Sequence, residues 1–130
     1  MYVTDTHALV YFADQKLTRL GKNARRIFQK AEDNESLIYV PAVVLWEVSQ
    51  LLAKRSLKMM MTFEQWCHGL DTSVGFSIAP LEWQDVNEAR RFRFKDPFDC
   101  LIAGTAARLG MPLITKDTQI SESGIIETVW

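Results

Sequence analysis

The sequence lacks the features that would place it in a membrane or in an oxidising compartment. None of its apolar runs approaches the roughly 20 residues that span a bilayer, and its first residues lack a basic leader followed by a cleavable apolar stretch. Its two cysteines, Cys67 and Cys100, form no CxxC pair, and one disulfide would add little to a chain that is 48% hydrophobic. We therefore expect a cytoplasmic protein without membrane contact, whose thiols are free and mostly buried.

The chain also lacks a charge excess, since 15 basic and 16 acidic residues give a net charge of -1. This total argues neither for nor against a nucleic-acid partner, so the distribution of the charges has to decide. The 130 residues can bury a sizeable core, and they contain no internal repeat or low-complexity tract. We expect a single domain over residues 1–130.

Strand and helix patterns alternate along the chain. The expected strands are residues 1–5, 37–40, 76–81, 111–117 and 125–130. The expected helices are residues 6–15, 18–31, 41–55, 62–70, 82–92 and 97–109, and a polar turn follows residue 117. Such alternation predicts an α/β fold with a parallel sheet covered on both faces.

Four carboxylates occupy positions where folding alone does not require a carboxylate, which suggests a functional site. Asp5 and Asp117 each lie at the end of an expected strand, so both should lie at the carboxyl edge of the sheet, where ligands bind. Glu47 and Asp99 lie on apolar helix faces without a cation at helical spacing, where burial of a carboxylate is costly unless a metal or a distant base compensates it. A single glutamate of this kind often turns to solvent. Clustering is the simpler explanation for four.

Hard oxygen ligands without a supporting set of histidines or cysteines suit Mg²⁺ or Mn²⁺ rather than zinc. Grouped carboxylates repel one another unless cations are present. Two divalent ions about 4 Å apart can position and deprotonate water for in-line attack on a phosphodiester. The pattern therefore predicts metal-dependent phosphodiester hydrolysis.

Four short stretches resemble one known family. They are "DTHAL" at residues 5–9, "LWEV" at 45–48, "DPFDCLIAGTA" at 96–106 and "PLITKD" at 112–117. Each is weak evidence alone, but four in the right order with matching separations are specific. From Tyr2 to Trp130 the chain resembles the PIN-domain ribonucleases, in particular the VapC toxins of bacterial and archaeal toxin–antitoxin pairs.

The resemblance implies a three-layer α/β/α fold with a five-stranded parallel sheet. It also implies an endoribonuclease that depends on Mg²⁺ or Mn²⁺ and hydrolyses RNA phosphodiester bonds. Proteins of this kind are usually homodimers, and a cognate VapB-type antitoxin holds them inactive.

The resemblance also assigns catalytic residues. Asp5 and Asp99 are expected to be the main metal ligands, with Glu47 and Asp117 completing the site directly or through water. Thr115 matches a supporting hydroxyl position beside the last acid. Metal-activated water is the expected nucleophile, so no histidine base is required.

Two roles remain open for Asp96, which immediately precedes Pro97. It can cap the helix that begins there, and in the "DPxD" subgroup it is also a candidate metal ligand beside Asp99. The chain departs from the family pattern at Pro41, where serine or threonine is frequent, and at Cys100, where arginine is frequent. The second change would weaken an RNA contact rather than the chemistry.

Two further stretches each have two interpretations. In "ARRFRFK", residues 89–95, the cations and rings suit RNA phosphates and bases, and they suit equally a solvated helix end with core phenylalanines. The RNA-binding candidates are Arg90, Arg91, Arg93 and Lys95. The stretch "LKMMMTFEQW", residues 57–66, offers an adaptable apolar surface to an antitoxin or a second protomer, or it packs in the core.

Other function classes fit less well. A receiver domain needs an aspartate after a central strand, where "YVPAV" and "IAPLE" have none, and a haloacid-type phosphatase needs an aspartate where His7 stands. We interpret His7 as support for the turn. The remaining alternative is a catalytically silent PIN-fold module that only binds RNA or a partner, against which the unpaired acids argue.

Overall fold

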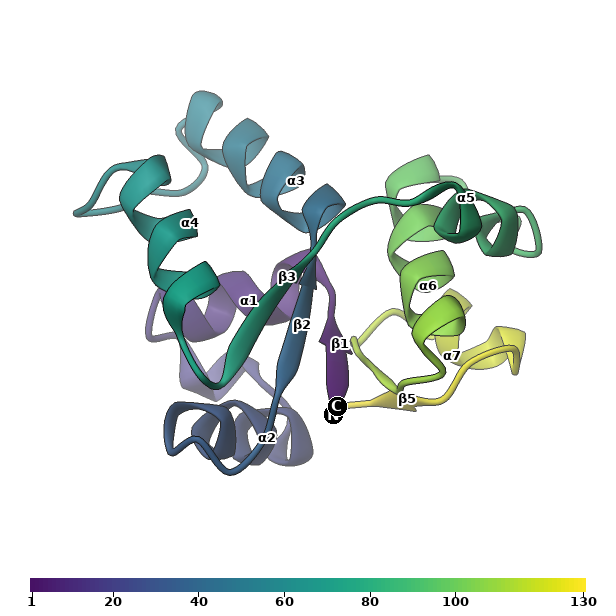
Figure 1. The fold of residues 1–130 in the computed structure, drawn as a ribbon, viewed down its shortest axis with the longest axis horizontal. Helices are drawn as coiled ribbons and strands as arrows, with labels where there is room; N and C mark the ends of the chain where they lie inside the picture. The colour runs from purple at the N-terminus through teal and green to yellow at the C-terminus, as the bar shows by residue number, and fades with distance from the viewer.

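The computed structural model describes residues 1–130, and a parallel sheet of five strands lies at its centre (Figure 1). The strands are β1 (Tyr2–Thr4), β2 (Ile38–Pro41), β3 (Phe76–Ala79), β4 (Leu113–Ile114) and β5 (Thr128–Val129). Their order is β3-β2-β1-β4-β5, and every neighbouring pair is parallel. The predicted five-stranded parallel sheet is confirmed.

The direction in which the chain builds the sheet reverses at β1. The chain adds β2 and β3 on one side of β1, and it later returns to add β4 and β5 on the other side. In open parallel sheets, ligands bind in the crevice beyond the carboxyl ends of the strands at such a switch point. Asp5 follows β1 directly and Asp117 follows shortly after β4, so both lie at this crevice.

Seven α-helices cover the two sides of the sheet and form the outer layers of an α/β/α fold. In Figure 1, α4 lies to the left of β1, β2 and β3, α2 lies below them, and α5, α6 and α7 lie to their right. The helices are α1 (Thr6–Ala13), α2 (Lys22–Glu32), α3 (Ala42–Ala53), α4 (Phe63–Thr72), α5 (Trp83–Ala89), α6 (Pro97–Leu109) and α7 (Thr118–Ser123). None of them combines the length and the apolar character that crossing a membrane requires.

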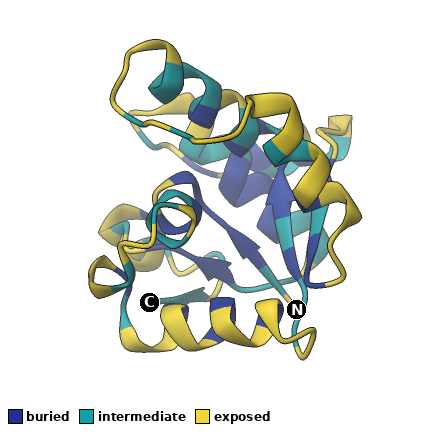
Figure 2. Ribbon diagram, turned by 90° about the vertical axis from the view of Figure 1, so that its left-hand side faces the viewer, coloured by how far each residue is buried: buried dark blue, intermediate teal, exposed yellow.

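The hydrophobic core lies between the sheet and its helices, where the dark blue positions of Figure 2 collect. Val3, Ile38 and Leu113, from three adjacent strands, are completely buried. Phe28 of α2 is also completely buried, and its ring stacks on Phe12 with 4.7 Å between the ring centroids. Burial of each large apolar side chain contributes about 1.5–3 kcal/mol, so this core fixes the strand ends that carry the site.

Three local features of the sequence set the ends of helices. Thr62 and Gln65 form a reciprocal capping box at the start of α4. Pro97 is the first residue of α6, where its missing N–H costs nothing. Gly110 ends the same helix with a left-handed backbone, at φ 63°.

Several predicted boundaries are wrong. The helix predicted for residues 18–31 begins only at Lys22, because Gly21 is extended and packs so closely on Trp130 that it has no room for a side chain. The helix predicted for residues 82–92 ends at Ala89. The strand predicted for residues 111–117 shortens to Leu113–Ile114, because β1 offers it only two partners before α1 begins.

Residues 118–124, predicted as a polar turn, contain the short helix α7. Asp117 caps its first turn, and Gly124 ends it with a left-handed backbone at φ 66°. Six helical residues are too few to show a hydrophobic period, so only these two cap residues indicated a helix. The cysteines are free, as predicted, but both are half-buried rather than mostly buried.

Helices α5 and α6 pack closely on each other, and this contact anchors the helix that carries Asp99. A Cβ atom at Gly104 would collide with the backbone oxygen of Asp85 in α5. Asp85 is completely buried, and its carboxylate accepts hydrogen bonds from the Arg108 guanidinium of α6 and from the Glu82 N–H. A close backbone approach and a buried ion pair therefore hold α6 against α5.

Candidate functional site

The predicted acids border a single cavity at the carboxyl edge of the sheet. The cavity has a volume of about 800 Å³, and none of its lining residues is hydrophobic. The acids that border it are Asp5, Glu47, Asp96, Asp99 and Asp117. Segments that are distant in the sequence thus bring five carboxylates to one place.

Asp5 links the end of β1 to the start of α1. Its Oδ1 accepts a hydrogen bond of 2.8 Å from the Ala8 N–H, which caps the helix, and only 9% of the residue is exposed. Burial raises the pKa of the Asp5 carboxyl, and hydrogen bonds from Thr115 and Ala8 oppose this rise. The Thr115 hydroxyl also accepts the Asp117 N–H at 3.1 Å, so this buried threonine connects two of the acids.

Glu47 lies on α3 and is half-buried at the cavity wall. Its Oε1 accepts a hydrogen bond of 2.6 Å from the Thr6 hydroxyl, which fixes the carboxylate toward the start of α1. Burial raises the pKa of Glu47, because this hydrogen bond only partly offsets the lost hydration. The alternative in which Glu47 turns fully to solvent does not hold.

Asp96 is the N-cap residue of α6 and Asp99 lies in its first turn, but the two acids differ in environment. Asp96 is exposed, and its Oδ1 accepts the Phe98 N–H at 2.9 Å, so it caps the helix while also bordering the cavity. Asp99 lies inside the helix and is half-buried. Burial, followed by the negative charges of Asp96 and Glu47, raises the pKa of Asp99 to about 7.

Asp117 caps α7, since its Oδ1 accepts hydrogen bonds from the N–H groups of Gln119 and Ile120 at 2.8 and 3.4 Å. Asp5 and Asp96 cap helices in the same way. Capping is therefore a sufficient structural reason for three of the five acids, and it was missed from the sequence for Asp5 and Asp117. It explains neither Glu47 nor Asp99, which lie inside helices.

None of the five acids has a cationic partner. The four ion pairs of the protein join other residues: Lys16 with Asp14, Arg91 with Glu88, and Arg108 with both Glu82 and Asp85. Lys95 and Lys116 border the cavity without pairing with an acid. The cluster therefore carries uncompensated negative charge that a bound cation would relieve.

The donor set fits a hard divalent cation, because it consists of carboxylates without a thiolate. The acids surround the cavity without converging on one point, since no group of three Asp, Glu, His or Cys side chains has the spacing of a metal site. A cation at this site would have to draw the carboxylates inward. Glu47 and Asp99 are free of capping bonds to the backbone and can move without unwinding a helix end.

The structure brings only one of the four predicted RNA-binding cations to the cavity, namely Lys95. Arg91 pairs with Glu88 at 2.7 Å instead. Phe92 is only 5% exposed and packs on Phe94, so its suggested role as a base-stacking ring is wrong. The core interpretation holds for these rings.

Five residues that border the cavity were not assigned to the site from the sequence, namely His7, Pro97, Lys116, Thr118 and Gln119. Lys116 lies between Thr115 and Asp117, and its Nζ donates a 3.0 Å hydrogen bond to the Tyr11 hydroxyl. His7 follows Asp5 by two residues. Their proximity to the acids in the sequence was the available signal.

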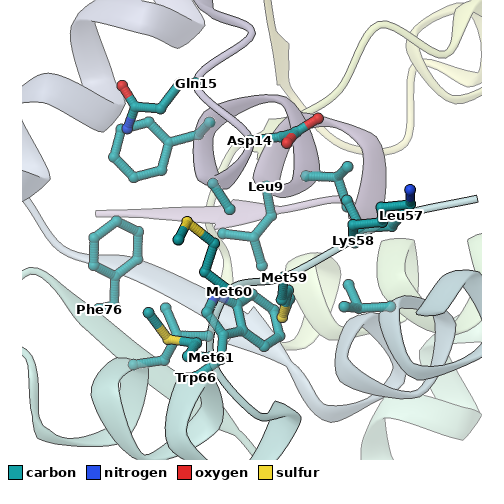
Figure 3. Close-up of a pocket in the computed structure, with 15 residues that line it drawn as sticks. Leu9, Asp14, Gln15, Leu57, Lys58, Met59, Met60, Met61, Trp66 and Phe76 are labelled. Carbon is teal, nitrogen blue, oxygen red and sulfur yellow. The ribbon is translucent and has the colours of Figure 1, made fainter.

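The methionine-rich segment borders a separate, apolar cavity of about 390 Å³ between α1 and α4 (Figure 3). Twelve of its 15 lining residues are hydrophobic, among them Leu9, Trp66 and Phe76. Met59 packs against the core, whereas Met60 is completely exposed at the rim. The core interpretation therefore holds for Met59, whereas Met60 provides the exposed apolar surface that the partner interpretation requires.

The reversal of strand order and the carboxylate-lined cavity define an α/β protein with an acidic site at the carboxyl edge of its sheet. A family model described as the PIN domain matches residues 2–125. The chain belongs to the PIN domain family, whose members are generally nucleases. No curated protein matches the sequence.

Solved structures share the fold at low sequence identity. VapBC2 from Rickettsia felis, bound to a DNA fragment from its promoter, aligns with a TM-score of 0.72 and 15% identity, covering 99% of this chain and 98% of that one. FitAcB from Neisseria gonorrhoeae aligns with a TM-score of 0.62 and 17% identity, covering 100% and 97%. FitAB bound to the IR36 DNA fragment aligns with a TM-score of 0.60 and 16% identity, covering 99% of this chain and 94% of that one. At these identities the likeness shows the fold.

Proposed function

We propose that this chain is a divalent-metal-dependent endoribonuclease and the toxin of a VapBC-type toxin–antitoxin pair. The observation that carries the proposal is the cluster of five unpaired carboxylates around one cavity, with the pKa of Asp99 raised to about 7. Membership of a family of nucleases supports the hydrolytic part. The carboxylate donor set supports Mg²⁺ or Mn²⁺ as the cofactor.

In the proposed site, Asp5, Glu47, Asp99 and Asp117 hold the cation, and Asp96 contributes while it caps α6. A bound Mg²⁺ or Mn²⁺ supplies Lewis acidity toward the phosphodiester and the attacking water. The protein supplies the positioning, since the Thr6 hydroxyl holds Glu47 and Thr115 connects Asp5 with Asp117. Lys95 and Lys116 bring positive charge to the rim for the RNA phosphates.

The proposed partners are a cognate VapB-type antitoxin and a second copy of the chain in a homodimer. The fold shared with VapBC2 and FitAB supports the antitoxin. The apolar cavity beside Met60 also supports a protein partner. Burial of this completely exposed side chain against a partner would remove apolar surface from water and so stabilise the complex.

The second candidate is a catalytically silent PIN module that binds RNA or a protein partner. Two observations favour it: three of the acids cap helices, and no three of the acids have converged to metal-ligand spacing. It leaves the positions of Glu47 and Asp99 unexplained.

Incubation of the purified chain, free of antitoxin, with total RNA separates these candidates. We expect cleavage in Mg²⁺ or Mn²⁺ and none in EDTA, because the acids need a cation to act on a phosphodiester. Cleavage is read by gel electrophoresis and by sequencing the fragment ends. Cleavage that persists in EDTA would falsify the metal mechanism, and a chain that cleaves no RNA in either metal supports the silent module.

A further inference from the structure

A second cavity opens directly beside the acidic one. It has a volume of about 500 Å³, within the range of ligand pockets. It shares His7, Glu47 and Asp96 with the acidic cavity, so the two cavities are adjacent. Its walls come from α3 and from the first turns of α1 and α6.

The walls of this cavity expose two aromatic rings. Ten large hydrophobic side chains are exposed on the protein, and two of them, Trp46 at 53% and Phe98 at 37%, border this cavity. Trp46 precedes Glu47 on α3, and Phe98 precedes Asp99 on α6. Each ring is therefore adjacent in sequence to an acid that capping does not explain.

The α3 wall presents a row of different side chains. Trp46, Gln50 and Lys54 follow one another at four-residue spacing, so they lie on one face of the helix, and all three border the cavity. Along this face, the distance from Glu47 in the sequence increases from the aromatic ring to the amide and then to the ammonium group. These are the groups that contact a base, its hydrogen-bonding edge and a phosphate.

We propose that this cavity binds a nucleobase of single-stranded RNA next to the phosphate held at the acids. Trp46 and Phe98 provide the stacking surface, Gln50 contacts the base edge and Lys54 contacts the neighbouring phosphate. The inference rests on the proposed function and extends it to a single-stranded substrate. The acids can hold a phosphodiester only through a bound cation, so contacts beside them have to add to the affinity, and base stacking contributes without charge.

The test measures binding of a short fluorescein-labelled oligouridylate by fluorescence anisotropy in Mg²⁺. Asp99→Asn serves as the common background, so that the RNA remains intact. Adding Trp46→Ala should weaken binding about 5- to 150-fold, the range for loss of one stacked base. The matched control is Trp83→Ala, because Trp83 is 74% exposed on α5 and does not border either cavity.

Two additional measurements test whether weaker binding by the Trp46→Ala variant comes from lost base stacking or from a general disturbance of the structure. Trp46→Phe should restore most of the affinity, because a ring returns to the same position. An oligomer of base-free ribose units should bind the Asp99→Asn protein and its Trp46→Ala derivative equally, since no base is available to stack. A Trp46→Ala effect that persists on the base-free oligomer would overturn the inference.

The remaining outcomes distinguish a failure of the proposed base subsite from a failure of the proposed nuclease function. If the wild type cleaves RNA and Trp46→Ala leaves affinity for oligouridylate unchanged, the base subsite is wrong and the nuclease proposal stands. If the wild type neither binds nor cleaves RNA, both are wrong. Light scattering gives the molar mass of each variant, and a dimer that Trp46→Ala splits into monomers would assign this face to a second copy of the chain instead.

Discussion

Replacement of Asp99 by asparagine is expected to abolish RNA cleavage and to leave the metal-free protein at least as stable as the wild type. Loss of groups that merely orient metal ligands costs 10- to 100-fold, so loss of a proposed direct ligand should exceed about 100-fold. Stability should not fall, because Asp99 makes no capping bond and faces the charges of Asp96 and Glu47. Cleavage kinetics and urea unfolding in EDTA measure the two effects.

The pH dependence of stability gives the Asp99 prediction a second readout. Because the pKa of Asp99 is about 7 in the folded protein, against 3.8 for an unperturbed aspartate, the folded state binds more protons between these pH values. The stability of the metal-free protein should therefore fall as the pH rises from about 4 to about 7, and then level off. Asp99→Asn should reduce this pH dependence of stability. Part of the dependence should remain, because burial also raises the pKa values of Asp5 and Glu47.

Asp96→Asn is the matched control for Asp99→Asn, since Asp96 caps α6 and Asp99 lies in the first turn of the same helix. Asparagine caps helices about as well as aspartate, so this variant should stay folded and retain part of the activity. Strong destabilisation by Asp99→Asn, or equal loss of activity in both variants, would contradict the distinction between ligand and cap.

Replacement of Asp85 by alanine should cause the largest loss of stability without changing the chemistry. Asp85 is completely buried, and its removal would leave Arg108, whose side chain is 22% exposed, without its main partner. Breaking a buried pair costs about 3–5 kcal/mol, and we expect the lower end because Arg108 can reach water. For a domain of this size, about 3 kcal/mol lowers the Tm by about 10 °C, which calorimetry resolves.

The control for Asp85→Ala is Glu88→Ala on the same helix. Glu88 pairs with Arg91 at 2.7 Å, but the Arg91 side chain is 55% exposed, so the pair is worth less than about 1 kcal/mol. The cleavage rate per folded molecule should match the wild type in both variants. A similar, small loss of stability in both would mean that the Asp85–Arg108 pair does not anchor α6.

The fold was largely predictable because local patterns agreed with the global arrangement. The runs around Ile38, Leu113 and Ile102 show strand and helix periods whose apolar sides the structure buries. The boundary near Gly21 was not predictable, because its extended conformation depends on Trp130, more than a hundred residues away. Tertiary contacts of this kind override local propensity.

The gathering of the acids followed from chain order, since Asp5 and Asp117 flank the switch point of a parallel sheet. Their capping roles did not follow, because a cap is recognisable only once the start of its helix is known. The burial of Phe92 and the position of Trp46 beside the acids depend on how α5, α6 and α3 pack. No spacing in the sequence encodes that packing.

A crystal structure of the wild-type chain grown with Mn²⁺, with anomalous diffraction measured to locate the ion, tests the proposed metal centre without relying on activity. We expect an anomalous peak in the acidic cavity, with Asp5 and Asp99 as ligands and with Glu47 and Asp99 drawn inward from their present positions. A cavity without Mn²⁺ at saturating concentration, with the carboxylates unmoved, would contradict a metal centre at this site.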